Sequence, residues 1–322
     1  MTDTTTPPTG PRALDSAYLP FLEAVGPTSP AQAPTEAGIE EMRAAAAQAR
    51  LQWKDGGATM DAVVEEAIET PRGEIGLRVY YPHAAGPLPT LVYFHGGGWA
   101  LLDNDTHDRL MREYAAASGW AVIGVAYPRA PEVRFPGIVT ACTAAIETIR
   151  QNLPRLGLIA PLALAGDSAG ANLALSTAIA LRDSGATNVD ALILNYGVYD
   201  GTCESPSYAA FSDPPLTLSR DRMAWFWDLY CPDPEARRHP LASPLFADLA
   251  GLPPVRLVTT GVDVLRDENL AMAVRLFEAG NALSLDHHPH APHAFVEALA
   301  LHPEGRQAIA AAAAWLNATV LR

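Results

Sequence analysis

Short apolar runs alternate with longer helical stretches along most of the chain. The runs are rich in Val, Leu and Ile, and they cover residues 90–94, 120–127, 161–165, 191–196 and 255–260. Helix-forming stretches follow most of them, at residues 105–118, 137–153, 169–183, 267–280 and 304–319. Short apolar strands are typical of sheets buried on both faces, and alternation with helices is typical of parallel strands. The pattern predicts an α/β fold with a mostly parallel central sheet flanked by helices.

The N-terminal part of the chain has a different pattern. Two stretches, 13–25 and 35–53, favour helix, and several prolines separate them. Within residues 63–82, apolar positions alternate with polar or small neighbours, which predicts a half-buried strand. The apolar positions of this alternation are Ile75, Leu77 and Val79.

The stretch between residues 196 and 255 breaks the strand–helix rhythm. It contains several prolines and the aromatic run Trp225-Phe226-Trp227. A connection of this length is uncommon in a compact domain, which predicts an insertion. An insertion at the carboxyl end of a strand lies over the ligand crevice of an open α/β sheet. Residues 216–230 therefore either line a substrate pocket or form a small helix whose aromatic side chains pack into the core.

Composition and charge narrow the class of protein. The chain has 49% hydrophobic and 18% charged residues, which suits a globular protein with a sizeable core. Its net charge of −14 argues against nucleic acids and anionic membrane surfaces as partners. No apolar stretch is long enough to cross a membrane, and the N-terminus does not read as a signal peptide. Three widely spaced cysteines indicate a reducing compartment, so we expect a cytoplasmic location.

A candidate nucleophile lies in the pentapeptide Gly166-Asp167-Ser168-Ala169-Gly170. An apolar run precedes it and a helix-forming run follows it, so the serine would lie on a sharp strand-to-helix turn. Glycines at both ends allow that turn without a side-chain clash, and the turn exposes the hydroxyl. The motif predicts acyl transfer through Ser168, with Asp167 pointing away in a structural role. A base, an acid and an oxyanion site must come from elsewhere in the chain.

The glycine-rich segment His95-Gly96-Gly97-Gly98 follows directly after the predicted strand at 90–94. Three consecutive glycines are costly to order, and one reason to keep them is close approach of backbone N–H groups to an oxyanion. A tight turn is the simpler explanation. The combination with Gly166–Gly170 favours an oxyanion site, formed by the N–H groups of Gly97, Gly98 and Ala169. We expect His95 to brace the glycine loop.

The acid and the base should follow the serine along the chain. Asp263 comes directly after the strand at 255–260 and is the candidate acid, with Asp267 as the alternative. Four histidines lie close together further on, but the prolines among them hold the segment extended, which disfavours a metal site. Of these, His293 is the candidate base and His290 is the alternative; His287 and His288 are expected to be strand or surface residues.

Together, these motifs resemble those of the hormone-sensitive-lipase-like carboxylesterases, bacterial esterase family IV. The order Ser, Asp, His is also the order of the α/β-hydrolases. The family's acid, base and Tyr-to-Glu motifs have counterparts in Asp263-Val264-Leu265-Arg266-Asp267-Glu268, His293-Ala294-Phe295 and Tyr127-Pro128-Arg129-Ala130-Pro131-Glu132. The departures are Val264 for proline, Ala294 for glycine, and Pro128-Arg129 within the last segment. None of them removes a catalytic group.

The resemblance implies an α/β-hydrolase fold with a helical cap. It divides the chain into an N-terminal cap segment (1–60), a catalytic core (61–200 and 245–322) and a cap insertion (201–244). It implies a serine carboxylesterase for short- to medium-chain esters, without a metal or another cofactor, as a monomer or homodimer. Glu132 is expected to support the glycine loop. The residues expected to bind the substrate are Trp99, Leu101, Val198, Trp225 and Phe226.

Two other functions use the same motifs. A related acyl hydrolase, such as an amidase, a lactonase or a natural-product deacetylase, would need the same three side chains. A ligand-binding protein built on an inactive hydrolase fold is also conceivable, because a fold alone does not establish catalysis. Such a protein can lack the histidine base, whereas His293 is present here.

Overall fold

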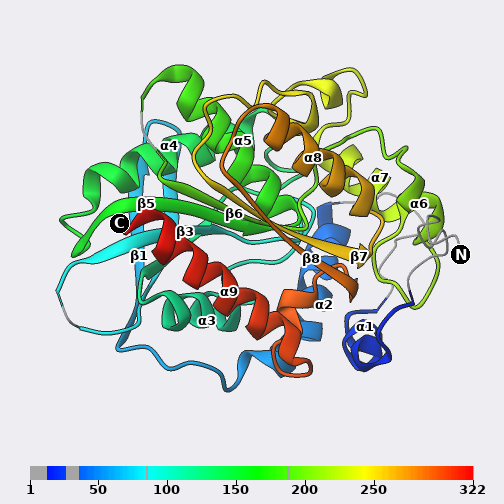
Figure 1. The fold of residues 1–322 in the computed structure, drawn as a ribbon, viewed down its shortest axis with the longest axis horizontal. Coiled ribbons are helices and arrows are strands. Elements are labelled where there is room, and N and C mark those ends of the chain that lie inside the picture. Colours follow the sequence, from blue (N-terminus) through cyan, green and yellow to red (C-terminus); the bar gives the residue numbers. More distant parts are fainter. Residues whose placement is uncertain (1–12, 27–35, 85, 187–188, 322) are drawn as a thin grey trace, which may run out of the picture.

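The computed structural model describes residues 13–26, 36–84, 86–186 and 189–321, and these form an α/β structure around one eight-stranded sheet (Figure 1). The strand order is β1-β2-β4-β3-β5-β6-β7-β8, and every pair from β4 to β8 is parallel. The strands are β1 (Ala62–Thr70), β2 (Gly73–Tyr81), β3 (Leu88–Phe94), β4 (Ala121–Ala126), β5 (Leu158–Asp167), β6 (Ala191–Asn195), β7 (Val255–Val262) and β8 (Leu283–Pro292). The predicted mostly parallel sheet is confirmed.

The N-terminal edge of the sheet is a hairpin. Residues 63–82 were expected to contain one half-buried strand, but β1 and β2 pair antiparallel across a turn at Pro71 and Arg72. Gly73 follows the turn with a φ of +108°, a conformation that favours glycine. The alternation occupies only β2, where Ile75, Leu77 and Val79 are buried; most of β1 is exposed.

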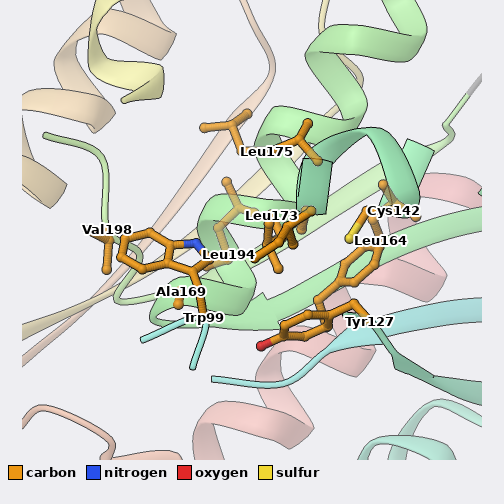
Figure 2. Packing of buried hydrophobic residues seen from close by; sticks show 14 of the residues in the cluster. Trp99, Tyr127, Cys142, Leu164, Ala169, Leu173, Leu175, Leu194 and Val198 are labelled. Atoms are coloured by element: carbon orange, nitrogen blue, oxygen red, sulfur yellow. The ribbon is translucent and has the colours of Figure 1, made fainter. Parts of the chain in front are cut away.

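Helices cover both faces of the sheet. In Figure 1, α4, α5 and α8 lie on one face, and α3 and α9 lie on the other. Each face has its own buried apolar cluster, and Figure 2 shows Trp99, Leu173 and Leu194 in the cluster that includes residues of α4, α5 and α8. The helices are α1 (Leu19–Val25), α2 (Glu36–Lys54), α3 (Asp108–Ser118), α4 (Gly137–Asn152), α5 (Ala169–Ser184), α6 (Pro206–Ala210), α7 (Arg220–Tyr230), α8 (Arg266–Glu278) and α9 (Pro303–Val320).

The stretch between β6 and β7 contains α6 and α7 together with two short 3-10 helices, Ala236–Arg238 and Pro244–Phe246. This stretch includes the expected cap insertion. The expected N-terminal cap segment contributes α1 and α2, whereas residues 1–12 and 27–35 lie outside the described residues. The division into cap and core stays a prediction.

The topology brings three loops together. Because β5, β6, β7 and β8 are parallel neighbours, the loops that follow them leave the sheet at the same edge. Ser168 follows β5, Asp263 follows β7 and His293 follows β8. No helix among the described residues is long and apolar enough to span a membrane.

Candidate active site

Ser168 occupies a sharp turn between β5 and α5. Its φ of +54° and ψ of −120° are unusual for a residue with a side chain. A strained backbone of this kind persists only when its surroundings hold it. Here the Ser168 N–H donates to the Asn195 carbonyl at 2.9 Å, and the Asn195 amide donates to the Gly166 carbonyl at 3.1 Å. The turn places the hydroxyl at the N-terminus of α5.

The two outer glycines allow α5 to pack directly on the sheet. A Cβ at Gly170 would lie 1.9 Å from the Phe94 carbonyl oxygen, and a Cβ at Gly166 would lie 2.4 Å from the Gly170 carbonyl oxygen. These neighbours are backbone atoms and cannot rotate away. Glycine is therefore required at both positions because of contact with the backbone.

A hydrogen-bonded chain runs from Ser168 to Asp263. His293 Nε2 lies 3.0 Å from Ser168 Oγ, and His293 Nδ1 lies 2.7 Å from Asp263 Oδ2. Asp263 is 2% exposed, and it also accepts hydrogen bonds from the Thr260 hydroxyl at 2.7 Å and the Leu265 N–H at 2.9 Å. These donors fix the carboxylate so that one of its oxygens faces the imidazole.

The alternative acid and base lie elsewhere. Asp267 accepts from the Ser207 N–H at 2.8 Å and pairs with Arg266, so it fastens α6 to α8. His290 is exposed on β8, and its Nδ1 lies 3.0 Å from the carbonyl oxygen of Ala13. The structure brings Asp263 and His293 to the serine and leaves the two alternatives outside this chain of hydrogen bonds.

The glycine loop folds back beside the serine. Gly97 and Gly98 have φ values of +111° and +61°, and the Leu101 N–H donates to the Gly97 carbonyl at 2.8 Å. The ring of Phe226 covers Gly98 so closely that a Cβ there would lie 2.1 Å from the ring. Both glycines line the same cavity as Ser168. Ala169, the first residue of α5, is fully buried.

His95 is buried at the start of this loop. Its ring stacks on that of Tyr127, with 4.3 Å between the ring centres, and the Tyr127 hydroxyl donates to the His95 carbonyl at 2.8 Å. Burial and the nearby His107 lower the pKa of His95 to about 3, which keeps its imidazole neutral at neutral pH. These contacts suit the expected role of His95 as a brace of the glycine loop.

Asp167 forms a buried ion pair behind the loop. Its carboxylate accepts from the Tyr93 hydroxyl at 2.9 Å and the Gly96 N–H at 3.1 Å, and it lies 3.3 Å from His107 Nε2. Burial alone would lower the pKa of His107, but Asp167 more than offsets this and raises it above its ordinary value. Burial alone would raise the pKa of Asp167, but His107 and Tyr93 hold it below its ordinary value. The pair ties α3 to the nucleophile turn and the glycine loop.

Ligand atoms of His107, Asp167 and Glu297 lie within 4.8 Å of one another, close enough for three groups to share a metal ion. The Asp167 carboxylate is already engaged by hydrogen-bond donors, and Glu297 Oε2 pairs with Arg50 Nε at 2.5 Å. These contacts account for the acidic groups as parts of ion pairs, so we assign no metal here.

The free energy of unfolding should depend on pH through His107 and Asp167. A raised folded pKa means that the stabilisation from His107 is complete below about pH 6.5 and is lost as the pH rises through the folded value. The lowered pKa of Asp167 means that its contribution is present above about pH 3.9 and is lost as the pH falls through the folded value. We expect His107→Gln to cost about 2 kcal/mol near neutral pH and to flatten the alkaline decline.

Urea unfolding at several pH values, followed by circular dichroism, measures this effect. His83→Gln removes an exposed histidine and serves as the matched control. Parallel pH curves for His107→Gln and the unmodified protein would contradict the assignment of the alkaline decline to this ion pair.

Glu132 pairs with Arg43 beside the glycine loop, where it was expected to act as a support. The two carboxylate oxygens of Glu132 lie 2.7 and 2.8 Å from the Arg43 guanidinium, which also donates to the carbonyls of Ala100 at 2.8 Å and Ala130 at 2.9 Å. Arg43 belongs to α2, and Ala100 follows the glycine loop. The guanidinium therefore fastens α2 to the segment beside the candidate oxyanion site.

A cavity opens at Ser168 between α2, α7 and the glycine loop. Of the five residues expected to bind substrate, Leu101, Val198 and Phe226 line it. Trp99 and Trp225 are not among its described lining residues. Trp99 is instead fully buried and stacks on Tyr230 at 4.2 Å, because its φ of +60° turns the ring away from the loop. The ring of Trp225 packs against that of Phe226, with 4.8 Å between the ring centres.

Sequence reasoning missed several charged residues around this site. Arg43, Arg50 and His107 lie on helices or loops that carry no motif, and their partners are distant in sequence. Arg222 lies two residues into α7, beside the aromatic run that drew attention to this segment. Arg222 lies one helical turn before the apolar residues Trp225 and Phe226. A charged residue on this apolar side of α7 was the signal that the sequence offered.

The chain matches known proteins over most of its length. Residues 91–297 match the family model for the α/β-hydrolase fold. The carboxylesterase NlhH of Mycobacterium tuberculosis is 34% identical over 241 residues, which are 73% of this chain and 75% of that protein. The acetyl esterase of Salmonella typhi is 33% identical over 234 residues, which are 71% of this chain and 72% of that protein.

Solved structures agree with these matches. A hyperthermophilic esterase from the archaeon Pyrobaculum calidifontis has a TM-score of 0.88 and 32% identity, covering 96% of this chain and all (100%) of that one. A thermostable esterase from Pseudomonas putida ECU1011 has a TM-score of 0.89 and 30% identity, covering 97% of this chain and 99% of that one. The chain belongs to the α/β-hydrolase fold family, among the hormone-sensitive-lipase-like carboxylesterases of bacterial family IV.

Proposed function

We propose that the protein hydrolyses short- to medium-chain carboxylic esters through an acyl-enzyme formed on Ser168. The observation that carries this proposal is the hydrogen-bonded chain from Ser168 Oγ through His293 to Asp263, with spacings of 3.0 and 2.7 Å. A nucleophile, a base and an orienting carboxylate in this order are the arrangement that activates a serine hydroxyl.

In the first half of the reaction, Ser168 Oγ attacks the ester carbonyl and His293 Nε2 takes its proton. Asp263 holds the imidazole in the tautomer that leaves Nε2 free to accept, and it stabilises the imidazolium that forms. The backbone N–H groups of Gly97, Gly98 and Ala169 donate to the oxyanion. His293 then protonates the departing alcohol, which leaves the acyl group on Ser168.

In the second half, water takes the place of the alcohol. His293 removes a proton from the water as its oxygen attacks the acyl carbonyl, and the same N–H groups stabilise the second oxyanion. Collapse of this intermediate returns the proton to Ser168 Oγ and releases the carboxylic acid. No metal or other cofactor is needed in either half.

The cavity favours small acyl groups. It has a volume of about 60 Å³, and it is lined by apolar side chains that include Leu101, Val198, Met223 and Phe226. We expect kcat/KM for p-nitrophenyl esters to peak between acetate and octanoate and to fall beyond laurate. Initial rates across the series from acetate to palmitate measure the profile, and a maximum at palmitate would contradict the proposed chain length.

The same assay separates the esterase from an amidase built on the same site. Anilides with the matching acyl groups are the comparison, because only the bond to the leaving group changes. We expect the esters to be cleaved faster, and faster anilide cleavage would overturn the esterase assignment. The relatives named carboxylesterase and acetyl esterase support the ester as substrate.

A further inference from the structure

The cavity beside Ser168 contains a buried arginine without an acidic partner. Arg222, on α7, is 8% exposed and lines the cavity. Its NH1 donates to the Thr217 carbonyl at 3.0 Å, whereas its buried Nε has no hydrogen-bond partner among the described residues. Within the same residues, no carboxylate forms an ion pair with this guanidinium, and the charged neighbour that influences it is Arg50. The donors of Arg222 are therefore only partly used by the protein itself.

Phe226 links Arg222 to the glycine loop. The guanidinium carbon of Arg222 is 5.7 Å from the centre of the Phe226 ring, one helical turn further along α7. The Phe226 ring packs directly on Gly98, in the glycine loop. Ser168 and His293 line the same cavity as Arg222. A substrate held at Ser168 therefore shares its cavity with the Arg222 guanidinium.

The neighbouring charges leave Arg222 unbalanced. Arg50 also lines the cavity, but its Nε pairs with Glu297 Oε2 at 2.5 Å, and both side chains are nearly buried. These two opposite charges offset each other. Burial and the proximity of Arg50 lower the pKa of Arg222 to about 10, which still leaves its guanidinium protonated at neutral pH. Asp167 also lines the cavity, but its carboxylate faces His107 Nε2 at 3.3 Å and accepts from the Tyr93 hydroxyl and the Gly96 N–H. Among the described residues, Arg222 therefore has no acidic partner of its own.

A buried charge without a partner is costly, and a ligand of opposite charge removes that cost. A guanidinium with free N–H groups suits a carboxylate in particular, because its donors match the two oxygens. We infer that the protein prefers esters that carry an anionic group, in the simplest case a carboxylate, which Arg222 binds while Ser168 attacks the ester carbonyl. This inference rests on the proposed ester hydrolysis and narrows its substrate class.

Two pairs of substrates test the inference. Monomethyl adipate and methyl hexanoate differ by a carboxylate in place of the terminal methyl group on the acyl side, and 4-acetoxybutanoate and butyl acetate differ in the same way on the alcohol side. The readout is the ratio of kcat/KM for the anionic ester to that for its neutral counterpart, measured by chromatography of the released products. We expect a ratio of about 10 or more in one pair, because a hydrogen bond to a charged group increases affinity by a factor of about 10 to 100.

Variants of α7 assign the preference to a residue. We expect Arg222→Met to lower the ratio about 10- to 100-fold and Arg222→Lys to retain part of it, because lysine keeps the charge. Arg220→Met is the matched control, since it removes the same charge from an exposed position two residues away. The ratio should be unchanged in that control. The substrate pair whose ratio falls in Arg222→Met shows whether Arg222 binds an anionic group on the acyl part or on the alcohol part of the ester.

The outcomes separate this inference from the proposed function. If the unmodified protein hydrolyses the neutral esters but prefers neither anionic ester, the inference fails and the esterase stands, whether or not any variant folds. An unchanged ratio in Arg222→Met, with a lowered melting temperature, would also overturn it and leave Arg222 as a brace for the Thr217 carbonyl. If none of the four esters is hydrolysed, the proposed function itself fails.

Discussion

Replacing Ser168 with alanine is expected to lower kcat/KM for p-nitrophenyl butyrate by about 10⁵-fold. The alanine has no oxygen to attack the carbonyl, so the acyl-enzyme cannot form, and His293 and Asp263 lose the atom on which they act. Only the oxyanion donors and the binding of the ester remain, and these give a small residual rate. Initial rates of purified protein, with the fold checked by circular dichroism, measure the loss.

Ser176→Ala is the matched control for this experiment. Ser176 lies two helical turns further along α5, and its buried hydroxyl has no hydrogen-bond partner among the described residues. This substitution should leave the rate unchanged. A p-nitrophenyl alkylphosphonate should transfer its phosphonyl group, with release of p-nitrophenol, to the unmodified protein and to Ser176→Ala but not to Ser168→Ala. If Ser168→Ala kept full esterase activity, the proposed mechanism would be wrong.

The second large effect concerns Gly170. We expect Gly170→Ala to lower the free energy of unfolding by about 3 kcal/mol or more, because the new methyl group would overlap atoms that cannot move away. These atoms are the Phe94 carbonyl oxygen, 1.9 Å from the ideal Cβ, and the His95 carbonyl oxygen, 2.7 Å away. To relieve the overlap, α5 must shift from β3. Such a shift would move Ser168 relative to the glycine loop, so the rate should fall as well.

Gly76→Ala provides the comparison. A Cβ at Gly76 would lie 3.5 Å from the Ala126 side chain, which is an ordinary contact, and Gly76 has no positive φ. The same change of residue type should therefore be neutral or slightly stabilising at this position. Thermal and urea unfolding of the two variants measure the difference. Equal stability would show that the contact between α5 and β3 tolerates a methyl group.

The parts of the site that follow from local backbone geometry could be read from the sequence. A serine between two glycines after an apolar run predicts the turn at Ser168, and Asp263 and His293 follow the next strands in the expected order. The hairpin in residues 63–82 was missed because only β2 has the alternation of a half-buried strand.

Side-chain direction and long-range pairing could not be read from the sequence. Trp99 follows the glycine loop directly, yet its positive φ turns the ring into the core. Arg43 and Glu132 are 89 residues apart, and either residue alone is typical of a solvated surface. The cytoplasmic location, the oligomeric state and the boundaries of the cap stay predictions of the sequence.

Part of the cavity wall belongs to a different segment of the chain from the candidate reacting groups. The candidate nucleophile and base follow β5 and β8, whereas Arg222, Met223 and Phe226 belong to α7, in the stretch between β6 and β7. A change of sequence in α7 can therefore alter which ester is accepted without altering the groups that cleave it. In this architecture, substitutions in α7 can change substrate selectivity while the candidate nucleophile, base and acid stay the same. Exchanging the α7 segment between relatives is therefore a way to change which ester is hydrolysed.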